Sequence, residues 1–415
     1  MKDMILENLD APERLEQIYR RDKGNFKRVF NELYPEISGN SIAEAWNARL
    51  NYFDEKQSRA STNRELIFVI IASLIAIVIA KLPDILTIEP DTYYPRNLGF
   101  IVFPALAAYF AWKNRLPNKT LTLIYSMTVF SLLFINLLPQ NEKSQTFILS
   151  CTHLPVVLWT LLGVSFTGSE FRQSKARLAY LRYIGDLIVM TTLILIAGAI
   201  LSGITVTLFE LIDMDIKLFY LKNIVLSGLA SAPIVATYII RNNQQIVSKV
   251  SPIIAKIFSP LVLVMVSAYL IAMIVTGKDP YNDREFLLVF NMLLIGVMAI
   301  IFFTVAEATG SGVGRSQVLI LFLLSLATII VNAIALSAII FRISEWGISP
   351  NKIAVLAANT LILINLLIVA YRLFGSLKDI SKVESVGDAI AKYIPVYAVW
   401  AAIVVFVFPF VFGFN

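Results

Sequence analysis

The side chains in this sequence that could do chemistry are few, and two ionisable ones lie in or beside long apolar stretches. His153 is the only histidine, and Glu307 ends the apolar run of residues 286–306. If these stretches cross a membrane, each such group is a functional hypothesis, because burying a charge in hydrocarbon is costly. His153 could relay protons or act as a base, and Glu307 could carry a coupling proton. Alternatively, His153 hydrogen-bonds between helices, and Glu307 either borders a flexible loop at the membrane surface or pairs with Arg315.

Amide side chains form a second polar set, in the apolar stretch of residues 353–374. Asn359 and Asn365 lie inside it, and Arg372 follows Asn365 by seven residues, so these two share one face of a helix. Amides in membrane helices usually form interhelical hydrogen bonds worth about 0.6–2 kcal/mol each, but they could also line a polar cavity. Together these residues form a candidate intramembrane polar site: His153, Glu307, Asn359, Asn365 and Arg372.

Enzymatic chemistry has little support in the sequence. No residue pattern indicates a Ser-His-Asp triad. A zinc site needs more ligands than the single histidine and the single cysteine, Cys151, provide. We therefore expect no metal and no cofactor. An enzyme is the least supported class, and a lipid-modifying enzyme would depend almost wholly on His153.

The composition is that of a membrane protein. The mean hydropathy is +0.73, 57% of the residues are hydrophobic and only 15% are charged, values outside the range of soluble globular proteins. A membrane β-barrel would show alternating segments of about ten residues, whereas this chain has long continuous apolar runs. We therefore predict an all-α polytopic protein whose partner is the lipid bilayer. The net charge of +6 needs no nucleic-acid partner, because membrane topology explains it.

The apolar runs predict about eleven transmembrane helices, each close to the length that a bilayer core requires. The second is short and could be tilted or incomplete. Alternating phenylalanines from Phe406 to Phe414 are interpreted as the lipid-facing end of the last helix. The transmembrane domain is accordingly residues 65–415. The predicted segments are 65–82, 98–112, 119–138, 146–165, 186–209, 218–240, 259–276, 286–306, 317–340, 352–374 and 394–413.

Residues 1–64 form a separate polar region with three predicted amphipathic helices. Helix start signals at Asp10 and Ser41 predict two of them, and a helical pattern that ends near Pro35 predicts the third. Such helices could pack into a small cytoplasmic head or lie on the membrane surface. A head of this kind could assist folding and orientation, or it could dock a protein partner.

The number of lysines and arginines alternates between high and low in successive predicted loops. The loops on one side, like the N-terminal region, are rich in these residues, whereas the opposite loops carry acids such as Glu210, Asp213 and Asp215. Lysine and arginine in short loops remain on the cytoplasmic side. The pattern therefore predicts a multi-pass protein of the cell inner membrane with its N-terminus in the cytoplasm and its C-terminus outside. Arg342 and Lys352 are the exception, because they fall on the outer side.

Small residues predict how two of the helices pack. Gly198 and Gly203 in the fifth segment and Gly228 in the sixth belong to small-xxx-small patterns, which let helix backbones approach closely. We therefore expect these two helices to pack together. A separate interfacial helix of residues 244–258 is predicted to end at Ser259, where the seventh membrane helix begins.

A polar turn leads into the tenth segment. It has the form Arg-Ile-x-Glu-aromatic-Gly-Ile-x-Pro, with Arg342, Glu345 and Gly347 as its marked residues, and Ser349 before Pro350 predicts a helix start. A turn of this form directly before a membrane helix resembles the bacterial multi-pass family described as domain of unknown function 4153. The resemblance implies a bacterial origin and a multi-span architecture, and it implies no reaction.

Three hypotheses for the function follow. The first is a subunit or scaffold of an envelope membrane complex, because the chain has a head and few ionisable groups in its spans. The second is a small-molecule or ion transporter or channel whose site is lined by the candidate polar residues. The third is a lipid-modifying membrane enzyme.

Overall fold

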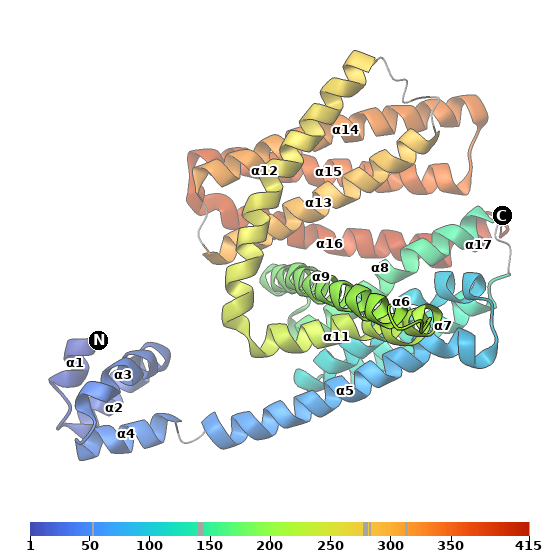
Figure 1. Ribbon diagram of the computed structural model, residues 1–415. Helices are drawn as coiled ribbons and strands as arrows, with labels where there is room; N and C mark the ends of the chain where they lie inside the picture. The colour runs from blue at the N-terminus through green and yellow to red at the C-terminus, as the bar shows by residue number, and fades with distance from the viewer. Residues whose placement is uncertain (52–53, 140–143, 277–280, 282–283, 312–313, 415) are drawn as a thin grey trace. The chain divides into compact units, whose positions relative to one another are not determined.

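The computed structural model describes residues 1–51, 54–139, 144–276, 281, 284–311 and 314–414, and every regular element in them is a helix (Figure 1). The all-α prediction is therefore confirmed. The helices are α1 (Lys2–Leu6), α2 (Pro12–Arg21), α3 (Lys23–Ile37), α4 (Ser41–Asn51), α5 (Asp54–Leu86), α6 (Pro90–Lys113), α7 (Asn118–Leu137), α8 (Gln145–Thr167), η1 (Gly168–Glu170), α9 (Ser174–Glu210), α10 (Lys217–Tyr220), η2 (Leu221–Val225), α11 (Leu226–Asn242), α12 (Gln244–Thr276), α13 (Arg284–Ser311), α14 (Arg315–Trp346), α15 (Pro350–Lys378), η3 (Ile380–Lys382), α16 (Val383–Phe406) and α17 (Phe408–Val411).

Contacts divide the chain into two units, Met1–Ile70 and Ile71–Asn415. The boundary falls within α5, whereas the sequence places it at residue 64. The first unit contains helices α1–α4, which we call the head. All four helices of the head contribute apolar side chains to one core, so the head has a hydrophobic interior of its own. Its fully or almost fully buried members include Ile5, Leu15, Phe26, Phe30, Leu33 and Trp46.

Two helices of the head begin where the sequence predicts, at Pro12 and Ser41, but their caps differ from those predicted. Helix α2 begins after Ala11, and no side chain caps it. The Asp10 carboxylate instead accepts a hydrogen bond of 3.3 Å from Nδ2 of Asn40. Oδ1 of Asn40 in turn accepts two backbone N–H groups of α4, at 2.9 and 3.2 Å. Asn40 is therefore the cap of α4, and Ser41 is its first helical residue.

Two arginines flank Glu16 on the surface of the head. Nε of Arg20 donates to Oε1 of Glu16 at 2.8 Å, and Nη1 of Arg49 lies 2.8 Å from Oε2. The hydrogen bond from Arg20, together with the charge and hydrogen bond of Arg49, lowers the pKa of Glu16. This ion-pair cluster connects α2 to α4.

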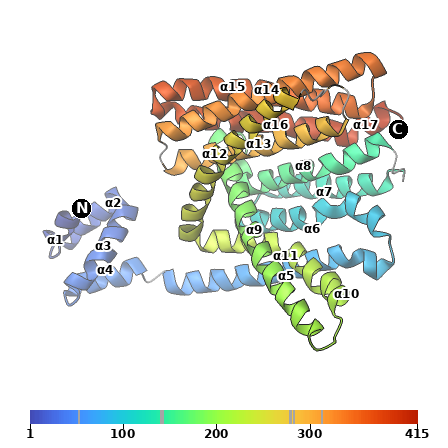
Figure 2. The same ribbon diagram turned by 45° about the horizontal axis from the view of Figure 1, so that its top comes forward.

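The second unit is a bundle of membrane helices. In the described residues, ten helices are long and apolar enough to cross a membrane, and every predicted apolar segment falls on a helix. The chain is thus a multi-pass helical membrane protein. Figures 1 and 2 show α13, α14, α15 and α16 side by side. Buried apolar residues of these helices form the largest core, among them Leu294, Ile301, Leu324, Leu366 and Ile390.

Helix α6 corresponds to the short second segment and is not among these ten helices. Its first turns contain the buried polar residues Arg96 and Asn97. Nδ2 of Asn97 donates to Oδ1 of Asn136 at the end of α7, at 3.1 Å. At the opposite end of α6, Asn114 donates to the carbonyl oxygen of Ser165 near the end of α8, at 3.0 Å. Helix α6 therefore runs the full length of its neighbours α7 and α8.

The C-terminal phenylalanines are only partly exposed. Helix α16 ends at Phe406, whose ring centre lies 5.1 Å from that of Phe134 on α7. Phe408 begins the next short helix, packs on Trp400 at 5.7 Å and is 6% exposed. Phe410 is exposed. The interpretation of this run as a lipid-facing helix end is therefore wrong for Phe406 and Phe408, because the helix breaks between them and neighbouring helices cover their rings.

Helix α12 is one continuous helix, so the predicted interfacial helix ending at Ser259 is wrong. The Ser259 hydroxyl caps no helix start. It donates to the carbonyl oxygen of Ala255 in the preceding turn, at 2.7 Å, and lies 2.9 Å from Oγ1 of Thr304 on α13. The buried hydroxyl pair joins α12 to α13, which is the structural role of this serine.

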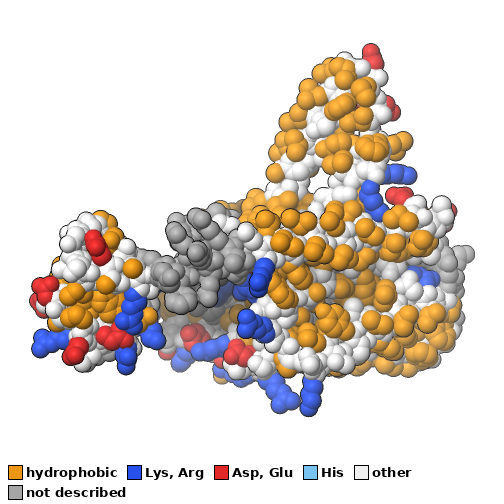
Figure 3. All heavy atoms as spheres, turned by 90° about the horizontal axis from the view of Figure 1, so that it is seen from below, with side chains coloured by type: hydrophobic (Ala, Val, Ile, Leu, Met, Phe, Trp, Pro, Cys, Tyr) orange, Lys and Arg blue, Asp and Glu red, His pale blue; other side chains and the backbone are white. Residues whose placement is uncertain are grey.

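The second half of α9, with α10, η2 and the start of α11, forms a hairpin that we call the arm (residues 192–229). Figure 2 shows it leaving α13–α16 at a steep angle, and it is the projection at the top of Figure 3, covered with hydrophobic side chains. Its exposed apolar residues include Ile196, Ile200, Leu208, Leu218 and Ile224. Three exposed acids lie at its tip: Glu210, Asp213 and Asp215.

The predicted packing through Gly198, Gly203 and Gly228 is wrong within the described chain. A Cβ built at any of these glycines would meet no atom within 4 Å, because no neighbouring helix approaches the arm there. The prediction that the two helices pack together is nevertheless confirmed, because α9 and α11 contact each other and the hydroxyls of Tyr183 and Thr237 lie 2.8 Å apart.

A different glycine of α9 allows close helix packing. A Cβ at Gly185 would overlap the ring of Phe303 on α13. Likewise, a Cβ at Gly163 of α8 would lie 2.8 Å from the ring of Tyr180 on α9. These two glycines therefore let α9 approach α8 and α13 where it lies inside the bundle.

Candidate functional site

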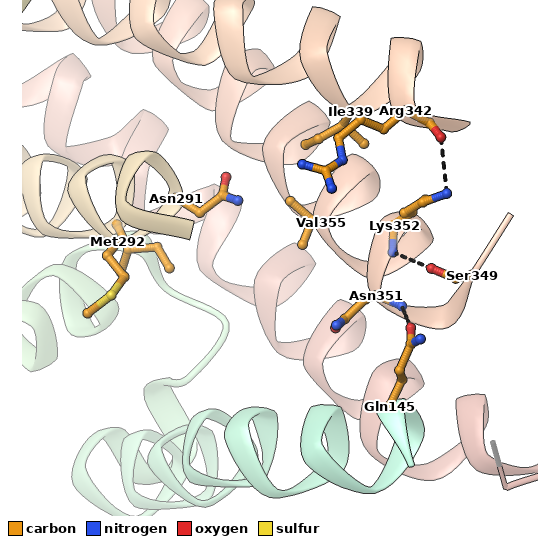
Figure 4. A pocket seen from close by; sticks show the side chains of 10 residues that line it. Gln145, Asn291, Met292, Ile339, Arg342, Ser349, Asn351, Lys352 and Val355 are labelled. Carbon is orange, nitrogen blue, oxygen red and sulfur yellow. Dashed lines mark hydrogen bonds between the residues drawn. The ribbon is translucent and has the colours of Figure 1, made fainter. Parts of the chain in front are cut away.

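A polar cavity of about 450 Å³ lies where α8, α13, α14 and α15 meet (Figure 4). It is at the end of α14 and the start of α15. Cationic and amide side chains line one part of it, and apolar side chains line the rest. The lining residues are Gln145, Asn291, Met292, Ile295, Ile339, Arg342, Ser349, Asn351, Lys352 and Val355.

Two cations make this cavity positive. The guanidinium carbon of Arg342 lies 5.1 Å from the ring centre of Trp346, in cation–π range. Nζ of Lys352 donates to the carbonyl oxygens of Arg342 and Gly347, at 3.0 and 2.6 Å. Nη1 of Arg342 is buried and has no hydrogen-bond partner in the described part of the chain. None of the described lining residues is an acid that could neutralise these charges.

A tight turn between α14 and α15 positions the cations. Gly347 has a φ of +70°, a left-handed conformation that favours glycine. Oγ of Ser349 accepts the backbone N–H of Lys352 at 3.4 Å, so the predicted helix start at Ser349 is confirmed. Oε1 of Gln145 on α8 accepts the backbone N–H of Asn351 at 3.2 Å. The turn is thus held to α8, and Lys352 is directed back at the end of α14.

A chain of amides leads from the cavity into the bundle. Asn291 lines the cavity, and its Oδ1 accepts a hydrogen bond of 2.7 Å from Nδ2 of Asn359. Nδ2 of Asn332 donates to the carbonyl oxygen of Asn359 at 3.0 Å. Asn332 and Asn359 are almost completely buried. These bonds join α13, α14 and α15, and they connect Asn359 to the cavity.

Two of the predicted site residues lie away from this cavity. Nδ1 of His153 is 2.9 Å from the carbonyl oxygen of Leu149 in its own helix and 3.3 Å from Oγ1 of Thr152. Glu307 of α13 has a carboxylate oxygen 3.6 Å from Nε of Arg182 on α9. Neither residue lines the cavity. The five predicted residues therefore do not form one site, because their described partners lie in different parts of the bundle.

Asn365 and Arg372 do not line a common wall. Nδ2 of Asn365 donates to the hydroxyl of Tyr397 on α16 at 3.0 Å, and Asn365 is 1% exposed. Arg372 is exposed. The prediction of a shared lining is therefore wrong. Seven residues fall about 20° short of two helical turns, and Arg372 lies where no neighbouring helix covers that edge of α15.

The marked residues of the turn have different roles. Arg342 lines the cavity, Gly347 makes the turn, and Glu345 is exposed. Lys352, which is not among the predicted site residues, lines the cavity together with Arg342. The sequence does point to Lys352, because this lysine and Arg342 depart from the distribution of cations among the predicted loops. A lysine and an arginine on the cation-poor side are not explained by topology, so they indicate another role.

No known protein family, curated protein or solved structure matches this chain. The chemistry of the cavity therefore rests on its geometry. Among the residues that the structure describes, no group of three or more His, Cys, Asp or Glu side chains could hold a metal ion. The cavity offers positive charge and hydrogen-bond donors beside apolar side chains, an arrangement suited to binding a negatively charged group.

Proposed function

We propose that the protein is a subunit or scaffold of a multiprotein complex in the inner membrane of a bacterium. The observation that carries this proposal is the arm, which leaves the bundle and keeps its small residues exposed. At Gly198 and Gly203, no other part of the described chain lies within 4 Å of an added Cβ. Small residues in membrane helices let a second helix approach closely. The partner that fits this surface is a transmembrane helix of another protein.

The tip of the arm supports the same proposal. Glu210, Asp213 and Asp215 are exposed there, next to apolar residues on both helices of the hairpin. Carboxylates are costly in hydrocarbon. The tip therefore needs either water at the membrane surface or cationic groups of a partner, and a partner helix beside the arm could supply such groups.

The head provides a second surface for a partner. It has its own core, and its surface carries ion pairs such as Lys2 with Glu36 at 3.5 Å. We place the head in the cytoplasm, because the N-terminal region is rich in lysine and arginine. A charged helical domain with a core of its own suits docking of a soluble partner or of a partner's cytoplasmic domain.

The topology is also part of the proposal. The ten candidate spans and α6 make eleven, because α6 runs the full length of α7 and α8. An odd number of spans with the N-terminus in the cytoplasm puts the C-terminus outside, in agreement with the loop charges. Membership in the family of domain of unknown function 4153 belongs to the same proposal. The turn from Arg342 to Pro350 supports it.

The test is purification of the full-length protein from native membranes in mild detergent, followed by mass spectrometry of the proteins that travel with it. We expect a protein partner in fixed stoichiometry. Gly198→Leu and Gly203→Leu fill the close-approach surface and should release a partner that binds the arm. The matched control is Gly296→Leu on α13, which is exposed and equally open but lies outside the arm.

The outcomes distinguish the two surfaces of the protein. A partner lost from Gly198→Leu and Gly203→Leu and retained by Gly296→Leu places the contact on the arm. A partner lost only when residues 1–62 are deleted places it on the head. A monodisperse single protein, extracted intact from native membranes, would overturn the proposal for stable complexes.

A transporter or channel is the alternative function, and the cavity with its amide chain favours it. The cavity continues into the Asn291–Asn359 pair between α13 and α15. In reconstituted liposomes, Asn359→Leu should abolish anion flux, whereas Thr360→Ala, on the exposed side of α15, should not. Flux that survives Asn359→Leu and Glu307→Gln would remove this alternative. The third hypothesis, a lipid-modifying enzyme, still depends on His153, whose described partners are Leu149 and Thr152 of its own helix.

A further inference from the structure

We propose that the cavity of Figure 4 binds an anionic phospholipid, with the phosphate group beside Arg342 and Lys352 and an acyl chain along the apolar wall that α13 contributes. This inference is independent of whether the protein is a complex subunit or a transporter. It rests on the charge, the unpaired donor and the lining of one cavity.

The positive charge has three sources. Arg342 and Lys352 both line the cavity. The α15 helix begins there, with Ser349 as its cap, and a helix N-terminus carries a partial positive charge. Two neighbouring cations in a partly buried, membrane-level cavity repel one another unless an anion lies between them. Because none of the lining side chains that the structure describes is acidic, a bound anion would supply the negative charge.

Arg342 has an available donor. Its Nη1 is buried and without a hydrogen-bond partner among the described residues. A buried unpaired donor on a charged group is costly, so a ligand that accepts this hydrogen bond would be stabilised. Phosphate oxygens match the planar guanidinium, which can donate two parallel hydrogen bonds.

The apolar part of the lining favours a lipid over a soluble phosphate. Met292 and Ile295 line the cavity and are also 67% and 59% exposed, so the cavity continues onto the lipid-facing surface of α13. Val355 lies one turn further into the membrane along α15 than the cationic Lys352, about 5 Å at 1.5 Å per residue. A phosphate held at the cations would thus place an acyl chain along these apolar side chains.

An aromatic side chain places the cations at the membrane interface. Trp346 is 54% exposed, and it lies 5.1 Å from the Arg342 guanidinium and 6.0 Å from Nζ of Lys352. Tryptophan is enriched at the level of lipid headgroups. The two cations are therefore at the depth where phospholipid phosphates lie.

The experiment is native mass spectrometry of the full-length protein, delipidated and then titrated with phosphatidylglycerol. We expect one saturable high-affinity lipid. Arg342→Gln should lower the affinity for this lipid about tenfold, which corresponds to the loss of about 1.4 kcal/mol from a charged hydrogen bond. The control is Arg372→Gln, which removes an exposed arginine of α15 that does not line the cavity; the lipid affinity of this variant should equal that of the wild type.

A second variant tests the cavity itself without changing charge. Val355→Phe adds volume to the apolar wall and should lower the affinity for the lipid. This variant tests the cavity even if Arg342→Gln proves unstable. Inorganic phosphate, titrated against the lipid-bound protein, distinguishes the two sources of the anion. If phosphate alone saturates the site and displaces the lipid, with the same dependence on Arg342, the acyl-chain assignment is overturned. Equal lipid affinity in the wild type, Arg342→Gln and Val355→Phe would overturn the whole proposal.

Discussion

The side-chain amide of Asn359 donates a hydrogen bond of 2.7 Å to Oδ1 of Asn291, and this bond connects the interior of α15 to the wall of the polar cavity on α13. Asn359 is 2% exposed, whereas Asn291 is partly exposed. One amide is thus held by the bundle and the other faces the cavity. The pair therefore connects the packing of α13 and α15 to the cavity wall.

Removing this hydrogen bond should lower stability moderately. Asn359→Ala leaves Oδ1 of Asn291 without its described donor, and we expect the free energy of unfolding to fall by about 0.6–2 kcal/mol, the range for interhelical hydrogen bonds in membranes. Chemical unfolding in detergent micelles measures this loss. Thr360→Ala is the matched control, because the Thr360 hydroxyl is exposed and bonds only within α15, to Leu356. Equal stability of the two variants would contradict the prediction.

Adding one methyl group should distinguish the packed glycine of α9 from an open one. Gly185→Ala places a Cβ in the volume of the Phe303 ring, and overpacking of this kind costs about 1–3 kcal/mol. Gly198→Ala, on the same helix, meets no atom within 4 Å and should leave the thermal midpoint of the isolated protein unchanged or slightly higher.

A compensating variant gives the control for this pair. If the cost at Gly185 is steric, Phe303→Ala should reduce the further penalty of Gly185→Ala, so that the two changes are non-additive. Additive losses in thermal midpoint would show that Gly185 matters for some reason other than the Phe303 ring.

A buried arginine should be far more important to stability than its exposed neighbour. Arg177 is 8% exposed; its Nε donates to the carbonyl oxygen of Ala391 on α16 at 2.7 Å, and its Nη1 donates to that of Phe171 at 2.8 Å. Arg177→Met should cost about 1.5–3 kcal/mol, the value of a hydrogen bond to a charged group. Arg172→Met removes an exposed arginine and should cost little. Similar thermal midpoints for these variants would contradict this account.

The stability of the head should depend on pH through Glu16. Its pKa is lowered in the folded state from the usual 4.5 by the hydrogen bond from Arg20 and by Arg49. A lowered pKa means that the ion pairs stabilise the head above about pH 4.5 and that this contribution is lost as the pH falls through the folded pKa. Glu16→Gln should therefore lower the stability of the head at pH 7. It should have no effect at a pH below the pKa values of Glu16 in the folded and unfolded states.

Hydrogen exchange of the α2 and α4 amides in the full-length protein measures this dependence. Wild type and variant are compared at the same pH, so the intrinsic exchange rates cancel. Glu13→Gln, a charge removal on the same helix, is the control and should not reproduce the pH dependence. A difference between wild type and Glu16→Gln that persists unchanged at low pH would rule out the ion-pair cluster as its cause.

Sequence patterns were sufficient for the class of protein and for most helices. Continuous apolar runs can satisfy their backbone groups in a membrane only as helices, so the segments follow from composition alone. The start of α15 was also predictable, because Ser349 supplies the cap and Pro350 the first-turn geometry within one local stretch. The cap at Asn40 could not be predicted from the sequence, because Asn40 and Ser41 are both good caps and only the conformation of the folded chain selects between them.

What the sequence alone determined is the helical membrane class, the segments that form helices, and the cations Arg342 and Lys352 that violate the charge pattern. Which residues meet was decided by tertiary structure. Gly198 and Gly185 lie on the same helix, yet only Gly185 has a neighbouring ring. Asn359 reaches Asn291, whereas His153 bonds within its own helix and Glu307 lies beside Arg182 of α9. In an apolar environment every face of a helix is apolar, so periodicity no longer identifies the inward face, and only the packing of the helices determines it.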